Sequence, residues 1–379
     1  MSLKNSRKKI DAIDEKLIKN FVERMQVAIE IAEAKKASNQ PILDESRERD
    51  ILDKITEEVE PPLDTYARKF YREIFALNRA YQGQMIYGES PYVETLRKAV
   101  KEGKLKLNQR AKVACPGILG SNTQEACDKM IQMAQIMYVN NFSAVFDAVE
   151  QGLCEYGVLP LENSANGSVK EVYDLLEKKD CHIVRATKQW IGHNLCAKKG
   201  TKLENLTKIY SHPQALAQAS KWLSQLKNAE LCPMENTATA AKFVANSEDD
   251  TIACVCSANC AKLYHLENLA EKIQNSDNNY TRFICISKNL DVYHGANKIS
   301  LITTANHFPG GLGAILSRFS SLGLNLTKLE SRPIVGRDFE FIFYLDFEAS
   351  LAEPSVRALL AELHDSQEGF TLLGNYIEY

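Results

Sequence analysis

Residues 4–38 read KNSRKKIDAIDEKLIKNFVERMQVAIEIAEAKKAS, and no glycine or proline interrupts them. The apolar positions recur three and four residues apart, which predicts one long helix with an apolar stripe; they are Ile10, Ile13, Leu17, Phe21, Met25, Ala28, Ile31 and Ala32. At a rise of about 1.5 Å per residue this helix is about 50 Å long, longer than a compact domain can cover. We therefore expect helices of a partner chain to bury part of the stripe.

Two further helices are expected before residue 90. The second runs from Asp44 to about Val59 and ends before Pro61 and Pro62, which cannot continue it. The third starts at Asp64, which is expected to cap it, and runs to about Gln82. Together the three helices predict an all-α N-terminal domain.

Length and composition predict several domains. A chain of 379 residues is too long for one ordinary core. The net charge of −3, from 46 basic and 49 acidic residues, gives no overall basic field, so nucleic acid and membranes are not expected partners. The chain contains no apolar run of about 18 residues and no apolar signal-peptide core, which predicts a cytoplasmic protein.

The cysteines predict free thiols rather than disulfides or a metal site. All ten lie between Cys115 and Cys285, and in a reducing compartment they stay unpaired. Cys254, Cys256 and Cys260 lack the paired ligands of a structural zinc site. We interpret them as small buried residues on a strand and on the helix that follows it.

The periodicity changes after a linker that contains Gly83, Gly88 and Pro91 and one short helix. From residue 111 onward short β-like runs alternate with helical stretches, which predicts a mainly parallel α/β domain. The runs are 112–114, 156–160, 182–187, 208–210, 251–255 and 282–287. The expected organisation is a helical domain at 1–90, a linker at 91–109, an α/β domain at 110–290 and a last domain at 297–379.

The last domain is predicted to be a βαββαβ unit of about 80 residues. Strands are expected at 299–304, 326–331, 339–347 and 371–379, and helices at 312–322 and 354–363.

Cationic side chains on the first helix can form an anion site. Arg24 and Lys35 are eleven residues apart, three helical turns, so they share one face at about 16 Å separation. Arg7 lies 28 residues before Lys35, about 42 Å along a straight helix, so it can act only in a partner's site. Asn78 and Gln82, four residues apart on the third helix, can aim their amides at one point.

Residues 4–84 resemble the helical type of chorismate mutase, with an early arginine, the Arg24-x10-Lys35 spacing, the run Asp44-x-x-Arg47-Glu48 and a closing pair of polar residues. Many relatives have serine where this chain has Asn78. The resemblance implies that chorismate is bound by Arg7 of a partner chain, Arg24, Lys35, Asp44, Arg47, Asn78 and Gln82. It implies no metal and no organic cofactor, because a pericyclic rearrangement needs no proton transfer. The arginines would hold the two carboxylates, and Lys35 and Gln82 would act catalytically at the ether oxygen, where negative charge develops.

Four motifs in order, within residues 110–290, resemble prephenate dehydratase. They are the glycine-rich turn 115–123, the run Leu161-Glu162-Asn163-Ser164, the run 210–214 around His212, and Thr281-Arg282-Phe283. The turn opens a helix, where backbone N–H groups can receive an anion. The resemblance implies a two-lobed fold like that of type 2 periplasmic binding proteins, with a cleft that closes to exclude water.

The same resemblance implies the roles in the cleft. Thr281 would hydrogen-bond or protonate the departing ring hydroxyl of prephenate. The carboxylates and the hydroxyl would be bound by Ser121, Asn163, Ser164 and Arg282. For Phe283 a ring pocket and core packing are both open, and His212 is expected to cap or pack at a helix start rather than act as a base. Family members commonly differ at Asn122 and Asn166.

The last domain resembles an ACT regulatory domain, with Pro309-Gly310-Gly311-Leu312 at a strand-to-helix turn and Glu330-Ser331-Arg332-Pro333 leaving a strand. The resemblance implies that L-phenylalanine is the effector, bound between paired domains by Gly310, Gly311, Leu312, Glu330, Ser331 and Arg332. Backbone N–H groups at such a turn suit an amino-acid carboxylate.

The three resemblances together predict a bifunctional enzyme of phenylalanine biosynthesis. It would convert chorismate to prephenate and prephenate to phenylpyruvate under feedback inhibition by L-phenylalanine, as a homodimer or tetramer. Two alternatives remain open. One is a dehydratase for prephenate or arogenate whose helical domain only dimerises. The other is an amino-acid-sensing binding protein, because fold does not dictate function.

Overall fold

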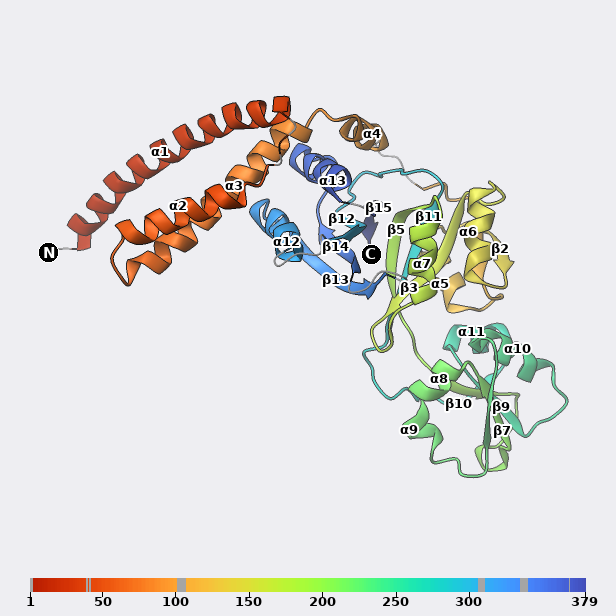
Figure 1. Ribbon diagram of the computed structural model, residues 1–379. Coiled ribbons are helices and arrows are strands. Elements are labelled where there is room, and N and C mark those ends of the chain that lie inside the picture. The colour runs from red at the N-terminus through yellow and green to blue at the C-terminus, as the bar shows by residue number, and fades with distance from the viewer. Residues whose placement is uncertain are drawn as a thin grey trace. The chain divides into compact units, whose positions relative to one another are not determined.

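The computed structural model describes residues 3–38, 40, 42–100, 107–305, 311–334, 340–367 and 369–379. Two compact units make up the chain (Figure 1). The first combines Met1–Val100 with Lys298–Leu372, and the second combines Lys101–Asn297 with Leu373–Tyr379.

The helices of the first unit follow the predicted pattern. Helices α1 (Leu3–Ser38) and α2 (Glu45–Glu58) confirm the first two, and Asp44 is the N-cap of α2. Helix α3 (Leu63–Tyr87) continues through Gly83, so the expected end at Gln82 was wrong. Pro62 rather than Asp64 occupies its N-cap position, and Asp64 lies in the first turn, where a carboxylate is favoured by the helix dipole. Helix α4 (Pro91–Ala99) is the short helix expected after it.

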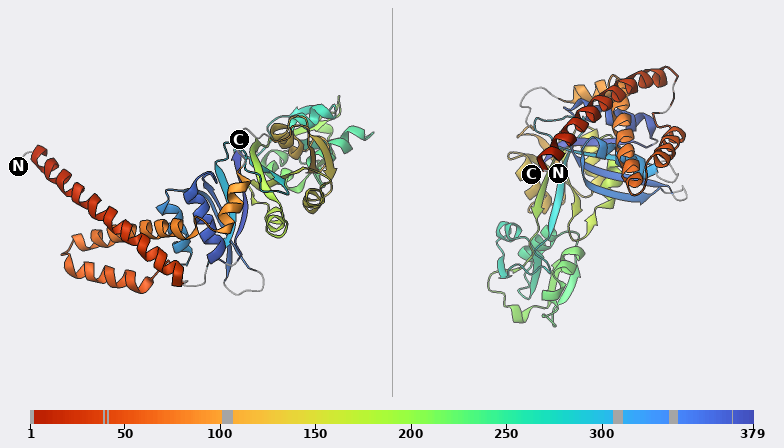
Figure 2. Two further views of the ribbon diagram at one scale, coloured as in Figure 1. Left: turned by 90° about the horizontal axis from the view of Figure 1, so that it is seen from above. Right: turned by 90° about the vertical axis from the view of Figure 1, so that its left-hand side faces the viewer.

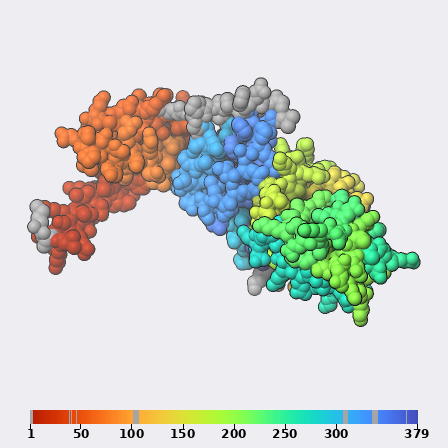
Figure 3. Space-filling model, turned by 90° about the horizontal axis from the view of Figure 1, so that it is seen from below, coloured from red at the N-terminus to blue at the C-terminus, as the bar shows by residue number. Residues whose placement is uncertain are grey.

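Helix α1 buries little of its apolar stripe within this chain. It packs against α3, and only Ala28 and Ala32 in its C-terminal half are buried. Ile10 and Ile13 are each more than half exposed. The N-terminal part of α1 extends beyond the other helices (Figures 2 and 3). The stripe therefore has the unpartnered face that the sequence predicts.

The C-terminal region has the predicted βαββαβ order, with its last strand belonging to the second unit from Leu373 onward. Its elements are β12 (Lys298–Thr304), α12 (Gly311–Ser321), β13 (Asn325–Pro333), β14 (Phe341–Glu348), α13 (Pro354–Ser366) and β15 (Thr371–Glu378). Strand β14 lies between β12 and β13 and is antiparallel to both. Helices α12 and α13 pack against α3, so the first unit shares one helix between its two halves.

The second unit contains two mixed sheets. The first has the order β5-β11-β3-β1-β2, with β4 paired to β3 and the end of β15 paired to β5. Its strands are β1 (Lys112–Pro116), β2 (Gln135–Val139), β3 (Tyr156–Asn163), β4 (Gly167–Ser168), β5 (His182–Trp190) and β11 (Tyr280–Ser287). Its helices are α5 (Asn122–Met130), α6 (Phe142–Glu150) and α7 (Lys170–Lys178). Strand β11 is antiparallel to both neighbours, so the predicted mainly parallel sheet is corrected to a mixed one.

The second sheet of this unit has the order β10-β6-β9-β7-β8. Its strands are β6 (Asn194–Ala197), β7 (Lys208–Ser211), β8 (Glu230–Pro233), β9 (Ile252–Cys256) and β10 (Glu267–Ala270). Its helices are α8 (Pro213–Gln218), α9 (Ser220–Leu223), α10 (Thr237–Asn246) and α11 (Ala258–Leu263), and a 3-10 turn, η1, covers Leu203–Asn205. Cys254 and Cys256 are buried on β9 and Cys260 on α11, as predicted, and all ten cysteines are free thiols.

Each sheet of the second unit has its own apolar core. Small residues such as Ala114 and Ala253 allow the helices to approach the strands closely. A cleft with both polar and apolar walls lies between the two sheets. No helix in the described part of the chain is both long and apolar enough to cross a membrane.

Candidate functional site

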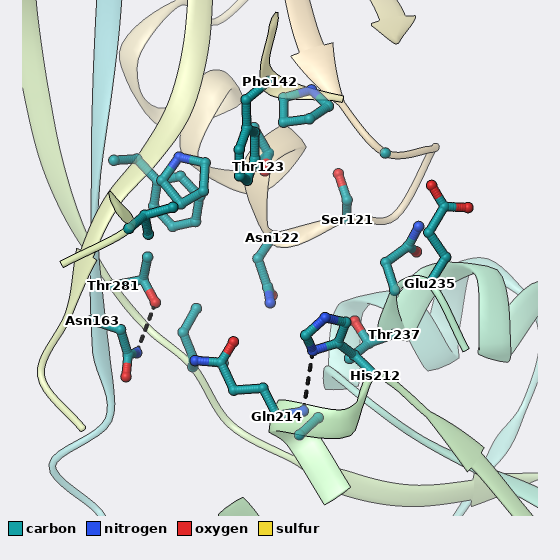
Figure 4. Close-up of a pocket in the computed structure, with 18 of the residues that line it drawn as sticks. Ser121, Asn122, Thr123, Phe142, Asn163, His212, Gln214, Glu235, Thr237 and Thr281 are labelled. Carbon is teal, nitrogen blue, oxygen red and sulfur yellow. Dashed lines mark hydrogen bonds between the residues drawn. The ribbon is translucent and has the colours of Figure 1, made fainter. Parts of the chain in front are cut away.

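A cavity of about 540 Å³ lies between the two sheets of the second unit (Figure 4). Both sheets contribute to its walls. Ser121, Asn163, Thr281 and Phe283 come from the first sheet and its helices, and His212 comes from the end of β7 in the second. Residues from all four predicted motifs therefore line one cavity.

Three helix N-termini line this cleft, together with the carboxylates of Glu171 and Glu235. Ser121 caps α5, Asn141 caps α6 and Asn236 caps α10, each through a side-chain oxygen that accepts from a backbone N–H. Residues from the start of all three helices line the cavity, and no lysine or arginine does so among the described residues. Anionic groups of a ligand would therefore be met by helix dipoles and N–H groups rather than by side-chain cations.

Thr281 lies on β11 at the cleft wall. Its Oγ1 is 3.0 Å from Nδ2 of Asn163, which lies opposite it in the register of β11 and β3. Figure 4 shows the two side chains at one wall of the cavity. Phe283, two residues further along the strand, lines the same cavity and is 2% exposed, so it both packs in the core and shapes the pocket.

Arg282 does not line this cavity. Neighbouring strand residues point to opposite faces of a sheet, so Arg282 lies behind Thr281 and Phe283. There its guanidinium pairs with Glu162 at 3.1 Å and with Glu378 at 2.7 Å, and it donates to the hydroxyl of Tyr376. The side chain is 3% exposed. The prediction that Arg282 binds a prephenate carboxylate is corrected to a buried ion pair on the back of the sheet.

Ser164 is also not among the cavity residues. Its hydroxyl donates to the carbonyl of Asn278 at 2.9 Å and accepts from the N–H of Tyr280 at 2.9 Å. It therefore holds the loop before β11 in place instead of facing the cleft.

Two histidines line the cleft, and burial lowers the pKa of both. His212 is the N-cap of α8 and its Nδ1 accepts from the N–H of Gln214 at 3.2 Å, which confirms the predicted capping role. His193 was not singled out from the sequence. It is 3% exposed, and its Nε2 lies 2.8 Å from Oε1 of Gln218. Both imidazoles are therefore neutral at pH 7.

The first unit holds a second candidate site, between α1 and α3. Three buried polar atoms there have no hydrogen-bond partner within the described residues: Nη1 of Arg24, Oδ1 of Asn78 and Oε1 of Gln82. Buried polar groups are rarely left unpaired, so these atoms indicate a site for a polar ligand. Arg24 also lies over the ring of Phe75, 5.6 Å from its centroid, and burial lowers its pKa.

The other predicted residues of this site are more dispersed. Lys35 donates to the carbonyl of Ile42 at 2.5 Å, which draws the start of α2 toward α1. Asp44 is exposed and its carboxylate accepts from the N–H of Arg47 at 3.1 Å, so in this chain it acts as a helix cap. That backbone hydrogen bond lowers the pKa of Asp44. The side chains of Arg7 and Arg47 are exposed.

Of the predicted effector residues, Gly310 lies outside the described residues. Gly311 and Leu312 begin α12. Glu330 accepts from Arg332 at 3.0 Å and lies 3.2 Å from Lys328, and Arg332 also lies over the ring of Tyr344. Glu330 and Arg332 therefore pair with each other along β13, and Ser331 between them is exposed.

In the described part of the chain no group of three or more His, Cys, Asp or Glu side chains is arranged to hold a metal ion.

The sequence patterns missed several cleft residues. Asn141 and Asn236 each precede a helix start, which is a recognisable capping signal. His193 and Gln218 in the cleft, and Asn279 next to it, carry no local signal, because they meet only through the tertiary fold.

Comparisons with known proteins match both parts of the chain that hold these candidate sites. Residues 113–291 match the family model of prephenate dehydratase, and residues 6–83 match that of type II chorismate mutase. The bifunctional chorismate mutase/prephenate dehydratase of Escherichia coli K12 is 30% identical over 98% of this chain and 95% of its own length. The bifunctional enzyme of Aquifex aeolicus is 32% identical over 99% of this chain and 97% of its own. The chain belongs to the family of bifunctional chorismate mutase/prephenate dehydratases.

A solved structure is also similar. The prephenate dehydratase of Arthrobacter aurescens in complex with L-Phe is 28% identical, with a TM-score of 0.63, and the match covers 70% of this chain and 89% of that one. The protein is thus an enzyme with a chorismate mutase domain and a prephenate dehydratase domain, as its sequence motifs predicted.

Proposed function

We propose that the protein converts chorismate to prephenate in the helical site and prephenate to phenylpyruvate in the cleft of the second unit. The observation that carries the second reaction is the hydroxyl of Thr281 at the wall of a cavity where three helix N-termini meet. A dicarboxylate with a leaving hydroxyl group suits this combination of anion sites and a hydroxyl whose hydrogen has no partner in the described residues.

The dehydratase chemistry needs one proton at one oxygen. As the bond from the ring to the carboxylate breaks, its electron pair enters the ring and CO₂ leaves. The bond from the ring to its hydroxyl breaks at the same time, and Thr281 hydrogen-bonds or protonates the departing oxygen. That oxygen becomes water on gaining one proton, which comes ultimately from solvent, so the Thr281 hydroxyl is restored after each turnover. Closure of the two sheets over the substrate would exclude water and strengthen the dipoles of α5, α6 and α10. The aromatic ring that forms supplies the driving force.

The mutase site would act by position and electrostatics. Arg24 and Arg47, with Arg7 of a partner chain, would hold the two carboxylates of chorismate in a compact conformer. Lys35 and Gln82 would donate to the ether oxygen, and Asn78 and Asp44 would complete the site. The unpartnered atoms of Arg24, Asn78 and Gln82 support a polar ligand at this position. No cofactor is part of this proposal.

A second copy of the chain completes this site in the proposed enzyme, as a homodimer or a tetramer. The exposed stripe of α1, with Ile10, Ile13 and Leu17 each about half exposed or more, supports a helical partner along it. Arg7 lies too far along the same helix to reach the ligand of its own chain.

L-phenylalanine is the proposed feedback inhibitor, and residues 297–379 the proposed ACT domain that binds it. The βαββαβ order supports this assignment, as does the L-Phe in the complex of the Arthrobacter aurescens enzyme. The proposed site includes Gly310, Gly311 and Leu312, of which the last two begin α12, and Glu330, Ser331 and Arg332 on β13. Residues 1–90 would form the mutase domain, 91–109 the linker and 110–290 a dehydratase domain like type 2 periplasmic binding proteins. A cytoplasmic location is consistent with ten free thiols.

The experiment is to supply chorismate and to measure prephenate and phenylpyruvate separately, with and without L-phenylalanine. We expect both products, with phenylpyruvate suppressed by the effector. Arg24→Ala should abolish the first reaction and spare turnover of added prephenate, whereas Thr281→Val should do the reverse. Turnover of prephenate or arogenate without turnover of chorismate would instead support a helical domain that only dimerises. If neither prephenate nor phenylpyruvate forms, the result would support an amino-acid-sensing protein.

A further inference from the structure

The side-chain amide of Asn163 has no hydrogen-bonding capacity left for a substrate. An amide offers two hydrogens on nitrogen and two lone pairs on oxygen. Oδ1 accepts from the N–H groups of Ala165 at 3.0 Å and Asn166 at 3.1 Å. Nδ2 faces Oγ1 of Thr281 at 3.0 Å and Oδ1 of Asn279 at 2.9 Å, with the carbonyl of Tyr280 at 3.2 Å. The two N–H groups fill both lone pairs of Oδ1, and the two hydrogens of Nδ2 are shared among three acceptors, so the protein itself uses all four positions.

Backbone groups dictate which way this amide points. The N–H groups of Ala165 and Asn166 can only donate, so the oxygen of Asn163 must face them. Its nitrogen must then face Thr281. The reverse orientation would place two N–H donors against Nδ2 and lose both hydrogen bonds.

Asn279 reinforces the same orientation from behind. It is 2% exposed, and its Nδ2 donates to the carbonyl of Ile191 at 3.1 Å and to Oε1 of Gln218 at 3.0 Å. A carbonyl oxygen can only accept, so the nitrogen of Asn279 must face Ile191 and its oxygen must face Asn163. The network thus has a fixed direction at each of its two asparagines.

The orientation of these two amides determines how the hydroxyl of Thr281 can hydrogen-bond. Its oxygen accepts from Asn163, and the described residues offer it no second partner. The hydroxyl hydrogen is therefore free to point into the cleft. We propose that Asn163 and Asn279 are positioning residues that orient the Thr281 hydroxyl as a donor toward the departing group of the substrate. This inference rests on the proposed role of Thr281, and it reassigns Asn163 from a substrate ligand to a residue that acts through Thr281.

The sharpest test is Asn163→Asp, which keeps the size of the side chain and removes its donor. The carboxylate can still accept from the N–H groups of Ala165 and Asn166, but its other oxygen would now accept the hydroxyl hydrogen of Thr281 and turn it away from the cleft. We expect kcat for prephenate to fall by about 100-fold, the usual effect of losing one transition-state donor, with KM changed by less than about threefold.

The pH profile separates this role from a merely structural one. A carboxyl in this buried position resists ionisation, and once protonated it can donate to Thr281 again. The kcat of Asn163→Asp should therefore rise relative to wild type as the pH is lowered from 8 to 6, after subtraction of an enzyme-free blank for the acid-catalysed loss of prephenate. Full activity at pH 8, or a loss that is the same at every pH, would overturn the proposal.

Asn279→Leu is the second variant, in case Asn163→Asp folds poorly. It removes the acceptor for Asn163, and we expect kcat to fall at least tenfold with little change in KM. The matched control is Asn278→Leu, because Asn278 precedes it in the chain and is exposed. Equal effects of the two substitutions would contradict the inference. Mutase turnover by the same preparations normalises the amount of chain, and the fluorescence of Trp190 and Trp222 shows whether the second unit is folded.

Thr281→Val distinguishes failure of the inference from failure of the proposed function. If Thr281→Val still forms phenylpyruvate, the role proposed for Thr281 fails, and the inference fails with it. If Thr281→Val is inactive while Asn163→Asp and Asn279→Leu are fully active, only the positioning network is wrong.

Discussion

The neutral imidazole of His193 should make the second unit sensitive to acid. Burial lowers the pKa of His193, which its hydrogen bond to Gln218 only partly offsets. In the unfolded chain its pKa is near 6.5, so the unfolded state takes up a proton first as the pH falls. The stability that the neutral histidine contributes is thus complete above about pH 6.5 and is lost as the pH falls through the lower pKa of the folded state.

We therefore expect the free energy of unfolding to drop more between pH 7.5 and 5.5 in wild type than in His193→Gln, which does not titrate. Denaturant unfolding can be followed by tryptophan fluorescence, because Trp190 and Trp222 are the two tryptophans of the chain and both belong to the second unit. His294→Gln, at an exposed histidine of the same unit, is the control and should keep the wild-type pH dependence. If the free energy of unfolding changes with pH equally in all three proteins, His193 is not the cause of the acid sensitivity.

At the scale of elements, strand β11 presents a proposed catalytic side chain on one face and a stabilising ion pair on the other. Thr281 faces the cleft, while Arg282 behind it joins β11 to Glu162 of β3 and to Glu378 of β15. Arg282→Met would leave two carboxylates without this partner, and breaking a buried pair costs about 3 kcal/mol or more. We expect the free energy of unfolding of the second unit to fall by this amount. KM for prephenate should stay unchanged in the protein that remains folded.

Lys188→Met supplies the comparison. Lys188 lies 3.5 Å from the same carboxylate of Glu378, but its side chain is 58% exposed, so its removal should cost less than about 1 kcal/mol. The double variant Arg282→Met/Glu378→Gln should recover part of the stability lost in Arg282→Met, since one of the two carboxylates that lose Arg282 is then uncharged. A raised KM with unchanged stability in Arg282→Met would restore the carboxylate-binding role inferred from the sequence.

Helices and strands whose apolar residues recur at a regular spacing were predictable from the sequence. Elements that depend on pairing with distant parts of the chain were not. The long run without glycine or proline predicted α1 within one residue at its start. The βαββαβ order was likewise predictable, because apolar alternation and helical spacing follow one another closely there. Short strands such as β6 and β8 were missed, since four residues carry little periodic signal. The direction of β11 was also not predictable, because antiparallel pairing depends on where the chain returns after the second sheet.

The candidate sites show the same division. Motif order identified Thr281, Asn163 and Ser121 correctly as neighbours in one cleft. The charge of Arg282 suggested a carboxylate ligand, but strand alternation places it on the far face. Alternation along 281–283 was available in the sequence and would have separated Arg282 from its neighbours. The amides of Asn279 and Gln218 are 61 residues apart and could be joined only by the fold.

At the scale of the whole molecule, the mutase site is expected to need two chains. Each chain would supply Arg24 and Lys35 to one site and Arg7 to the other, since closed dimers repeat one contact twice by symmetry. A dimer of Arg7→Ala chains lacks one cation in both sites, and so does a dimer of Lys35→Ala chains. In a mixed dimer both defects fall in the same site, and the other site is complete.

Mixing the two inactive chains by denaturation and refolding should therefore restore mutase activity. Random pairing gives about half mixed dimers, each with one intact site of two, so about a quarter of wild-type activity is expected. The control mixes Arg24→Ala with Lys35→Ala. Both residues serve the site of their own chain, so every mixed dimer still has one defect in each site and should stay inactive. Dehydratase activity with added prephenate normalises the amount of folded enzyme. Absence of recovery in mass-verified mixed dimers, or equal recovery in the control, would mean that Arg7 does not act in the site of its partner.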